Sequence, residues 1–221
     1  MFAARSLLMF ALLPIFAGCQ MFSAKPVNPN EGLTRMQGQL TAEGGQLWFQ
    51  PCNSQRRFSI SDSGNTGVLQ EAGALAARKG ALFADLRGGF VAGSGMDGQV
   101  NLQTLYRVER SATACGDANF KKLIVHADGN NPKWTANVNE KGLVLNREGK
   151  DAIALPYVEE QLPDGRLDLS TEANGQRIEL WVAPQRCVDP VDGSVQHLTA
   201  ELRVNGQVQR GCAYYGGARN D

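Results

Sequence analysis

Hydrophobic and polar residues alternate in short segments along most of the chain after about residue 34, and this period of two predicts β-strands. Five such segments lie in the first half of the chain: Met36–Thr41, Gln46–Gln50, Arg57–Ile60, Ala81–Val91 and Gln99–Arg110. Between the third and fourth segments the period changes, because Leu69, Ala72 and Leu75 recur at helical spacing. The first half is therefore predicted to contain three strands, one helix and two further strands.

This order of elements is the one used by the OB-type barrel, in which five strands close around a small core. We therefore predict a mostly β protein whose first domain, residues 34–116, is an OB-like five-stranded barrel with one helix.

The second domain, residues 117–215, is predicted to be wholly β, as an antiparallel meander that forms a curled sheet or a small barrel. About eight short alternating segments are separated by turn-forming residues. They are Leu123–Ala127, Trp134–Val138, Leu143–Asn146, Ile153–Val158, Leu167–Leu169, Ile178–Val182, Leu198–Val204 and Val208–Ala213. The last two flank Asn205-Gly206, which is a strong hairpin signal.

The N-terminal residues 1–18 are predicted to be a signal peptide. Arg5 gives a positive start, and Leu7–Phe16 is an apolar run of about ten residues, half the length that spans a bilayer. Small residues then precede Cys19, and this segment resembles the lipobox of bacterial lipoproteins. The resemblance implies cleavage before Cys19 and acylation of its thiol, with palmitate as a candidate acyl group. An ordinary cleaved signal with a chance cysteine is the alternative.

Gln20 follows the cysteine, where an Asp would retain a Gram-negative lipoprotein at the inner membrane. The resemblance therefore implies an outer-membrane protein that is lipid-anchored and faces the periplasm. Residues 19–33 contain Pro26 and Pro29 and show no apolar periodicity, so we predict an extended, lipidated tether.

Charge and composition exclude one large class of partner. The 22 Lys and Arg residues balance the 22 Asp and Glu residues. A nucleic-acid-binding protein would show a basic stripe, and we expect no nucleic-acid partner. No C-x-x-C motif occurs, and His126 and His197 stand at no familiar ligand spacing, so we expect neither a metal nor a cofactor.

Four cysteines remain after Cys19, and they can pair in three ways. Proximity in the sequence favours Cys52–Cys115 and Cys187–Cys212, each of which would staple its own half of the chain. A metal site is the weaker alternative for these thiols.

The sequence contains no catalytic constellation that we can assign. Residues 93–98 match G-x-G-x-x-G, but an alternating strand follows them rather than a helix, so they are predicted to be a hairpin loop. No G-x-S-x-G elbow occurs. A hydrolase that uses His197 with Asp189 or Asp192 is the least favoured hypothesis, because these aspartates are predicted to form a turn. Trp48, Trp134 and Trp181 fall within predicted strands and are expected to pack in cores.

The second half resembles a family of uncharacterised bacterial envelope proteins. The shared residues are Gly129-Asn130-Asn131-Pro132-Lys133-Trp134, Cys187-Val188-Asp189 with Gly193, Asn205-Gly206 and Gly211-Cys212. The resemblance supports a Cys187–Cys212 bond. The chain departs from the family at Val191-Asp192, where the family has Met-Ser.

The first half is similar to the OB-type domain of NlpE-type lipoproteins, which signal envelope stress. Phe49-x-x-Cys52, Leu69 and the strand around Phe83–Leu86 carry this similarity. Together these features predict a non-enzymatic outer-membrane lipoprotein that acts in binding or in envelope stress and maintenance, with another envelope protein as partner. The alternative is a periplasmic protein that carries a small ligand inside a β-barrel.

Overall fold

The computed structural model describes residues 30–79, 82–93, 97–173 and 175–219. Residues Gly32–Asp221 form one compact unit. The predicted signal peptide, Cys19 and most of the predicted tether lie outside the described residues, so their predictions stay predictions.

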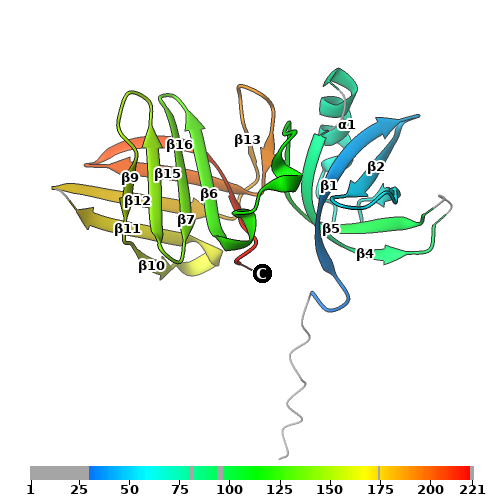
Figure 1. The fold of residues 1–221 in the computed structure, drawn as a ribbon, viewed down its shortest axis with the longest axis horizontal. Coiled ribbons are helices and arrows are strands. Elements are labelled where there is room, and N and C mark those ends of the chain that lie inside the picture. Colours follow the sequence, from blue (N-terminus) through cyan, green and yellow to red (C-terminus); the bar gives the residue numbers. More distant parts are fainter. Residues whose placement is uncertain (1–29, 80–81, 94–96, 174, 220–221) are drawn as a thin grey trace, which may run out of the picture. The chain divides into compact units, whose positions relative to one another are not determined.

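The first sheet is built on a ring of five strands: β1 (Thr34–Glu43), β2 (Gln46–Pro51), β3 (Phe58–Ser61), β4 (Leu82–Val91) and β5 (Gln99–Glu109). Around the ring, β1 pairs with β2, β2 with β3, β3 with β5, β5 with β4, and β4 with β1. Figure 1 labels β1, β2, β4 and β5 of this ring. All pairs are antiparallel except β3–β5. The helix α1 (Val68–Lys79) lies between β3 and β4 in the chain, so the predicted OB-like order of elements is confirmed.

Alternation along the strands fills the ring with apolar side chains. Leu40, Phe49 and Leu86 are fully buried there, and α1 adds Val68 and Ala72 to the same core. The segment before α1 is fixed by Asp62, whose carboxylate accepts the backbone N–H groups of residues 66 and 67 at 2.8 and 2.9 Å.

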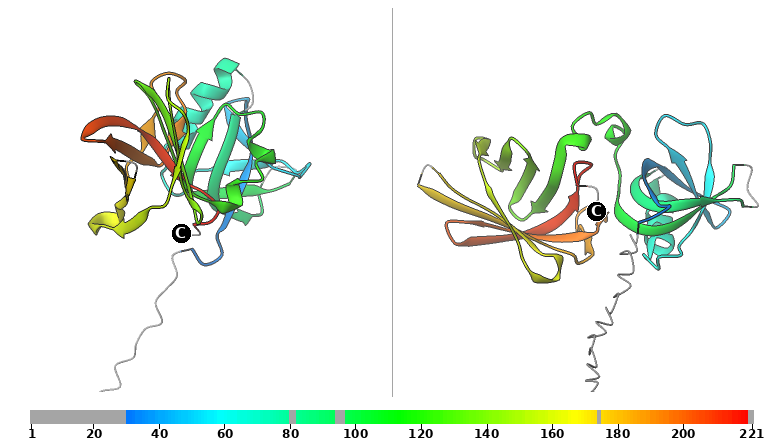
Figure 2. Two further views of the ribbon diagram at one scale, coloured as in Figure 1. Left: turned by 60° about the vertical axis from the view of Figure 1, so that its left-hand side comes forward. Right: turned by 90° about the horizontal axis from the view of Figure 1, so that it is seen from below.

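The second sheet has nine antiparallel strands in the order β10-β11-β12-β15-β16-β6-β7-β8-β9. Their bounds are β6 Leu123–Asn130, β7 Lys133–Asn139, β8 Gly142–Arg147, β9 Ile153–Leu155, β10 Val158–Gln161, β11 Leu167–Ala173, β12 Gln176–Ala183, β15 Leu198–Val204 and β16 Gln207–Tyr215. The sheet curls strongly (Figure 2) and encloses a core that includes Trp134, Leu145, Leu169 and Leu180. Among the described residues, three short 3₁₀ helices complete the fold: Ala114–Gly116, Phe120–Lys122 and Pro163–Gly165.

One predicted strand is divided in the structure. The sequence pattern predicts a single strand over Ile153–Val158, whereas β9 ends at Leu155 and β10 begins at Val158. Pro156 has no backbone N–H for a strand ladder, and the chain changes direction there. Because β9 and β10 form the two edges of the sheet, residues 156 and 157 carry the chain from one edge to the other.

The hairpin predicted at Asn205-Gly206 is confirmed. The register pairs Val204 with Gln207, which leaves two residues in the turn. Both have positive φ, 50° for Asn205 and 83° for Gly206, as a tight hairpin turn of this type requires.

Two strands were not predicted. β13 (Cys187–Val188) and β14 (Val195–Gln196) form a hairpin that joins the first sheet, because β14 pairs with β5. Each strand has two residues, which is too short for a sequence pattern to show alternation. A segment from the second half of the chain thus extends the sheet of the first half.

Both predicted disulfides are confirmed. Cys52–Cys115 ties the turn after β2 to the 3₁₀ helix after β5. Cys187–Cys212 connects β13 with β16, which belong to different sheets. The second bond is therefore more than a staple within one half, since it joins the two sheets covalently.

A pair of glycine substitutions tests this packing with opposite expected signs. A Cβ added at Gly211 on β16 would overlap the carbonyl oxygen of Asp128 on β6, so Gly211→Ala should lower the free energy of unfolding by about 3 kcal/mol. In α1, no atom lies near an added Cβ at Gly73. Because alanine favours the helix over glycine, Gly73→Ala should raise the free energy of unfolding by about 1 kcal/mol. Urea unfolding of both variants measures the changes. Equal stability of the two variants would contradict the β6–β16 packing.

Candidate functional site

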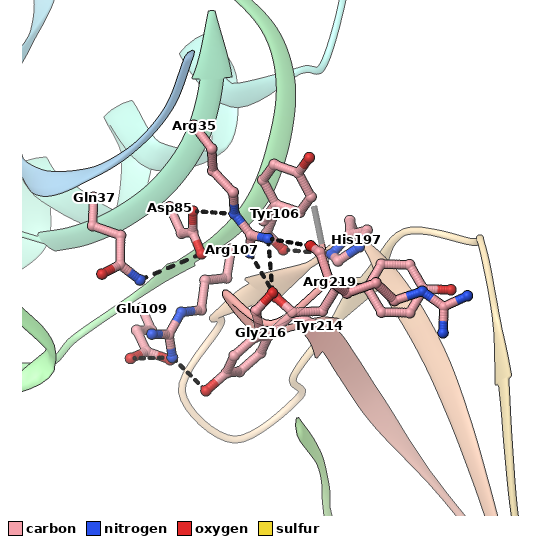
Figure 3. Close-up of polar contacts among 11 residues, drawn as sticks. Arg35, Gln37, Asp85, Tyr106, Arg107, Glu109, His197, Tyr214, Gly216 and Arg219 are labelled. Atoms are coloured by element: carbon pink, nitrogen blue, oxygen red, sulfur yellow. Dashed lines mark hydrogen bonds and ion pairs between the residues drawn. The ribbon is translucent and has the colours of Figure 1, made fainter. Parts of the chain in front are cut away.

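A buried polar junction connects the first sheet to the end of β16 (Figure 3). Its centre is Arg35 on β1, whose guanidinium donates to both carboxylate oxygens of Asp85 on β4, at 3.0 and 2.8 Å. The same guanidinium donates to the backbone carbonyls of Tyr215 at 2.6 Å and Gly216 at 2.9 Å. It also lies over the ring of Tyr106, 3.7 Å from the centroid. With a further hydrogen bond to the backbone carbonyl of Arg219 at 3.3 Å, this one side chain serves a carboxylate, three carbonyls and an aromatic face.

The burial of this ion pair decides its energetic role. The side chain of Asp85 is fully buried and that of Arg35 is 9% exposed. Removing two charges from water costs free energy, so a buried ion pair contributes little more to stability than a well-packed apolar pair would. Losing one partner, however, leaves the other charge buried and unpaired. The pair therefore fixes which surfaces meet rather than acting as a reactive group.

Arg107 on β5 makes a second contact to β16. It donates to the phenol oxygen of Tyr214 at 2.6 Å and to Glu109 at 3.1 Å, and it lies 4.0 Å from the centroid of the Tyr214 ring. Burial raises the pKa of Tyr214 above its ordinary value, even though Arg107 opposes this effect. The phenol is therefore neutral and is committed to this contact.

His197, between β14 and β15, completes the junction as a neutral side chain. Its Nδ1 lies 3.0 Å from the carbonyl oxygen of Tyr106, and its Nε2 is buried without a hydrogen-bond partner. Burial lowers the pKa of His197 to about 4, an effect that Arg35 reinforces and the contact with Tyr106 opposes. We assign the ring proton to Nδ1, since only a donor suits the carbonyl. A general base at this buried position could not be reached by a substrate from solvent.

The aspartates considered as partners of His197 have other contacts. Asp189 is buried and accepts the side-chain amide of Asn130 and the backbone N–H of Val191. Asp192 accepts the backbone N–H of Ser194 at 2.7 Å. Both carboxylates therefore organise the turn between β13 and β14, as the loop-forming prediction has it.

A polar cleft of about 290 Å³ adjoins the junction, lined by side chains that include Glu109, His126, Asp128 and Gln196. Asp128 lies between His126 Nε2 at 3.5 Å and Gln196 Nε2, which donates at 2.8 Å. Burial tends to raise the pKa of Asp128, but its contacts with His126 and Gln196 outweigh burial and lower it. The carboxylate of Asp128 thus interacts with side chains of the protein itself. In the residues that the structure describes, no three His, Cys, Asp or Glu side chains are placed to hold a metal ion.

An exposed aromatic patch lies where the β4–β5 loop of the ring meets the β2–β3 turn. We call it the loop patch and define it as Arg56, Phe58, Phe90, Val91 and Asp97, which line a hollow of about 560 Å³ together with nearby loop residues. Phe90 is 51% exposed and Val91 is 40% exposed. The Phe90 ring lies 4.8 Å from that of buried Phe58, and Arg56 lies over Phe58 at 4.9 Å.

The loop patch is fixed by its own hydrogen bonds. Arg56 donates to the backbone carbonyl of Asp97 at 3.0 Å, and the Asp97 carboxylate accepts the backbone N–H of Arg57 at 2.8 Å. Residues 94–96 of the G-x-G-x-x-G segment lie outside the described residues. β5 begins at Gln99 directly after this segment, so the hairpin-loop prediction agrees with the described part.

Two of the three tryptophans depart from the predicted core positions. Trp134 is buried, with 1% exposure, but Trp48 is only partly buried and Trp181 is 38% exposed. Trp181 lies on β12 and faces away from the core, since its neighbours Leu180 and Val182 point into it.

The polar junction was missed by sequence reasoning, although the sequence holds a signal. Asp85 stands inside the apolar segment Leu82–Leu86, and Arg107 stands between Tyr106 and Val108. A charge within an apolar strand indicates a buried partner, but it does not indicate which residue that partner is. For the loop patch, the signal is Phe90-Val91 directly before a glycine-rich loop.

Comparison of the chain with protein-family models, with curated proteins and with solved structures finds no match. The resemblances to lipoproteins, to the uncharacterised envelope family and to the NlpE-type domain therefore stay predictions. Within the described part of the chain, no helix is long and apolar enough to cross a membrane.

Arg35→Met should lower the free energy of unfolding by about 3–5 kcal/mol, because Asp85 would keep a buried charge without its partner. Asp85→Asn should also be destabilising. The double variant should lose clearly less than the sum of the two single losses, since it leaves no unpaired charge. Urea unfolding measures all four proteins. Additive losses would contradict direct coupling of the pair.

His197 makes the stability depend on pH in a defined window. Its folded pKa of about 4 is below the unfolded value of 6.5, so the unfolded chain binds a proton first as the pH falls. The stability that His197 contributes is complete above pH 6.5 and is lost between 6.5 and about 4, by about 3 kcal/mol. The free energy of unfolding, measured at several pH values, should fall less for His197→Asn than for the wild type between pH 6.5 and about 4. Parallel pH profiles of the two proteins would contradict the prediction.

Proposed function

We propose that this chain is a non-catalytic binding module of the bacterial cell envelope, anchored to the outer membrane through acylated Cys19. It faces the periplasm and docks an envelope protein through the loop patch. The single observation that carries the docking proposal is the half-exposed ring of Phe90 beside Val91 and Arg56.

The composition of the loop patch supports a protein partner. Aromatic and arginine side chains are enriched where binding energy concentrates in protein interfaces. Phe90 offers an apolar face, while Arg56 and Asp97 supply a polar rim. Phe58, buried beneath, backs the exposed ring, so the ring has little freedom to lose on binding.

The chemistry of the polar groups favours binding over catalysis. His197 is buried and neutral, and Asp189 and Asp192 are engaged in their own turn. The four cysteines among the described residues form two disulfide bonds, Cys52–Cys115 and Cys187–Cys212. These side chains are held by structural contacts and offer no solvent-accessible nucleophile beside a base.

The second candidate function is carriage of a small ligand inside a barrel. We rank it second because apolar side chains fill the interiors of both sheets. Leu40, Phe49 and Leu102 occupy the ring of the first sheet, and Trp134 and Leu145 occupy the curled second sheet. A carrier of this kind keeps an internal cavity large enough for its ligand.

The test is cross-linking and affinity capture from intact envelopes that express the full chain. The wild type should recover a specific envelope protein, and Phe90→Ser should reduce that recovery at least tenfold, since exposed aromatic anchors dominate binding energy. Val191→Ser is the matched control, because Val191 is 74% exposed on a different loop. Cys19→Ser should abolish the acyl mass of the chain in intact-mass analysis.

Unchanged recovery by Phe90→Ser, at unchanged thermal stability, would rule out the loop patch as the docking site. Intact-mass analysis of the wild type that found no acyl mass on Cys19 would rule out the anchor.

A further inference from the structure

Trp181 lies on an uncovered face of the second sheet. Its strand β12 is an interior strand, paired with β11 on one side and β15 on the other. A single exposed aromatic residue is common on protein surfaces and needs no explanation. Trp181 differs because its ring borders a hollow of about 350 Å³ and because a neighbouring charge network holds it in place.

The hollow follows from the size of the residues that share the outer face with Trp181. Along β12 the next outward residue is Ala183, and the register pairs it with Thr199 on β15. These two short side chains stand beside the large indole. The register also pairs Trp181 with Glu201, and Arg166 and Arg210 line the same hollow.

The indole is held before any ligand arrives. Arg203 lies over its ring, 4.1 Å from the centroid, and donates through Nε to Glu201 at 2.7 Å. Arg210 Nε lies 3.6 Å from the other oxygen of Glu201. Trp181 is among the residues that line the hollow, whereas Arg203 is not.

These groups define the chemistry of the ligand. Trp181 contributes an aromatic ring to the lining, and such a ring attracts polarised C–H groups. The remaining lining offers donors from Arg166 and Arg210, an acceptor from Glu201, and a hydroxyl of Thr199 that can do both. A pyranose ring has the matching surface, since it presents C–H groups on one face and hydroxyls around its edge.

Two other ligand classes fit less well. An extended peptide binds by pairing with a sheet edge, and β12 has both of its edges paired. A polyanion would extend past the hollow toward Asp168, which the register places opposite Trp181, and Glu160, which it places opposite Asp168; Glu201 in the lining also repels it. We therefore propose that the hollow beside Trp181 binds a neutral saccharide ring of a glycan chain.

This proposal is independent of the loop patch, which belongs to the other sheet. The test uses the purified full chain in detergent and two soluble probes, chitotetraose and maltotetraose, with calorimetry as the readout. At least one probe should bind saturably. Trp181→Ala should weaken that binding at least tenfold, whereas Trp181→Phe should keep it within a few-fold, because an aromatic face remains.

Thr199→Val separates a binding role from a structural one, since it keeps the shape of the side chain and removes the hydroxyl; it should weaken binding several-fold. Val208→Ser is the surface control, with Val208 49% exposed on β16, and should bind like the wild type. Phe90→Ser should also bind sugar normally, and Trp181→Ala should recover the protein partner normally.

The proposal is overturned if neither probe binds the wild type at millimolar concentration. It is also overturned if Trp181→Ala and Thr199→Val bind as well as the wild type, or if Trp181→Ala instead abolishes recovery of a protein partner.

Discussion

The arrangement of the two sheets depends on one buried cation. Arg35 satisfies Asp85 within the first sheet and, through further N–H groups, backbone carbonyls at the end of β16 and in the residues after it. A guanidinium suits this position because its five donors point in fixed directions within one plane. A lysine could neutralise Asp85 but could not reach the same set of acceptors with that geometry. The C-terminal end of the second sheet is therefore defined by a charge located near the start of the first.

Other contacts strengthen the same junction by different physical means. Arg107 reaches Tyr214, the β13–β14 hairpin pairs with β5, and Cys187–Cys212 links that hairpin to β16. A hydrogen bond, backbone strand pairing and a covalent bond thus meet at one place in the fold. Charges buried at such a junction stabilise little in themselves, but they penalise any other packing of the two surfaces. We interpret the junction as the element that turns two small sheets into one unit that can present surface sites in fixed positions.

The sequence predicted those parts of the fold that depend on local pattern. Alternation located the five strands of the ring, helical spacing located α1, and Asn205-Gly206 located a hairpin. Proximity of the cysteines predicted both disulfides correctly. Alternation failed where the deciding contact was distant in the sequence. β14 is a strand only because β5 lies beside it, and Arg35 and Asp85 are 50 residues apart. Trp181 was expected in a core because a pattern of alternation does not tell which face of a sheet is covered.

The division of β9 from β10 has a consequence for how copies of this chain meet. The edge strands of the second sheet are β9, with three residues, and β10, with four residues that include Glu159 and Glu160. Short edge strands, and charged side chains on an edge strand, are poor templates for strand pairing between molecules. A protein tethered to a membrane surface, as we propose, is crowded among its own copies. A wide sheet with such margins can remain apart from its neighbours there and resist self-assembly into fibrils.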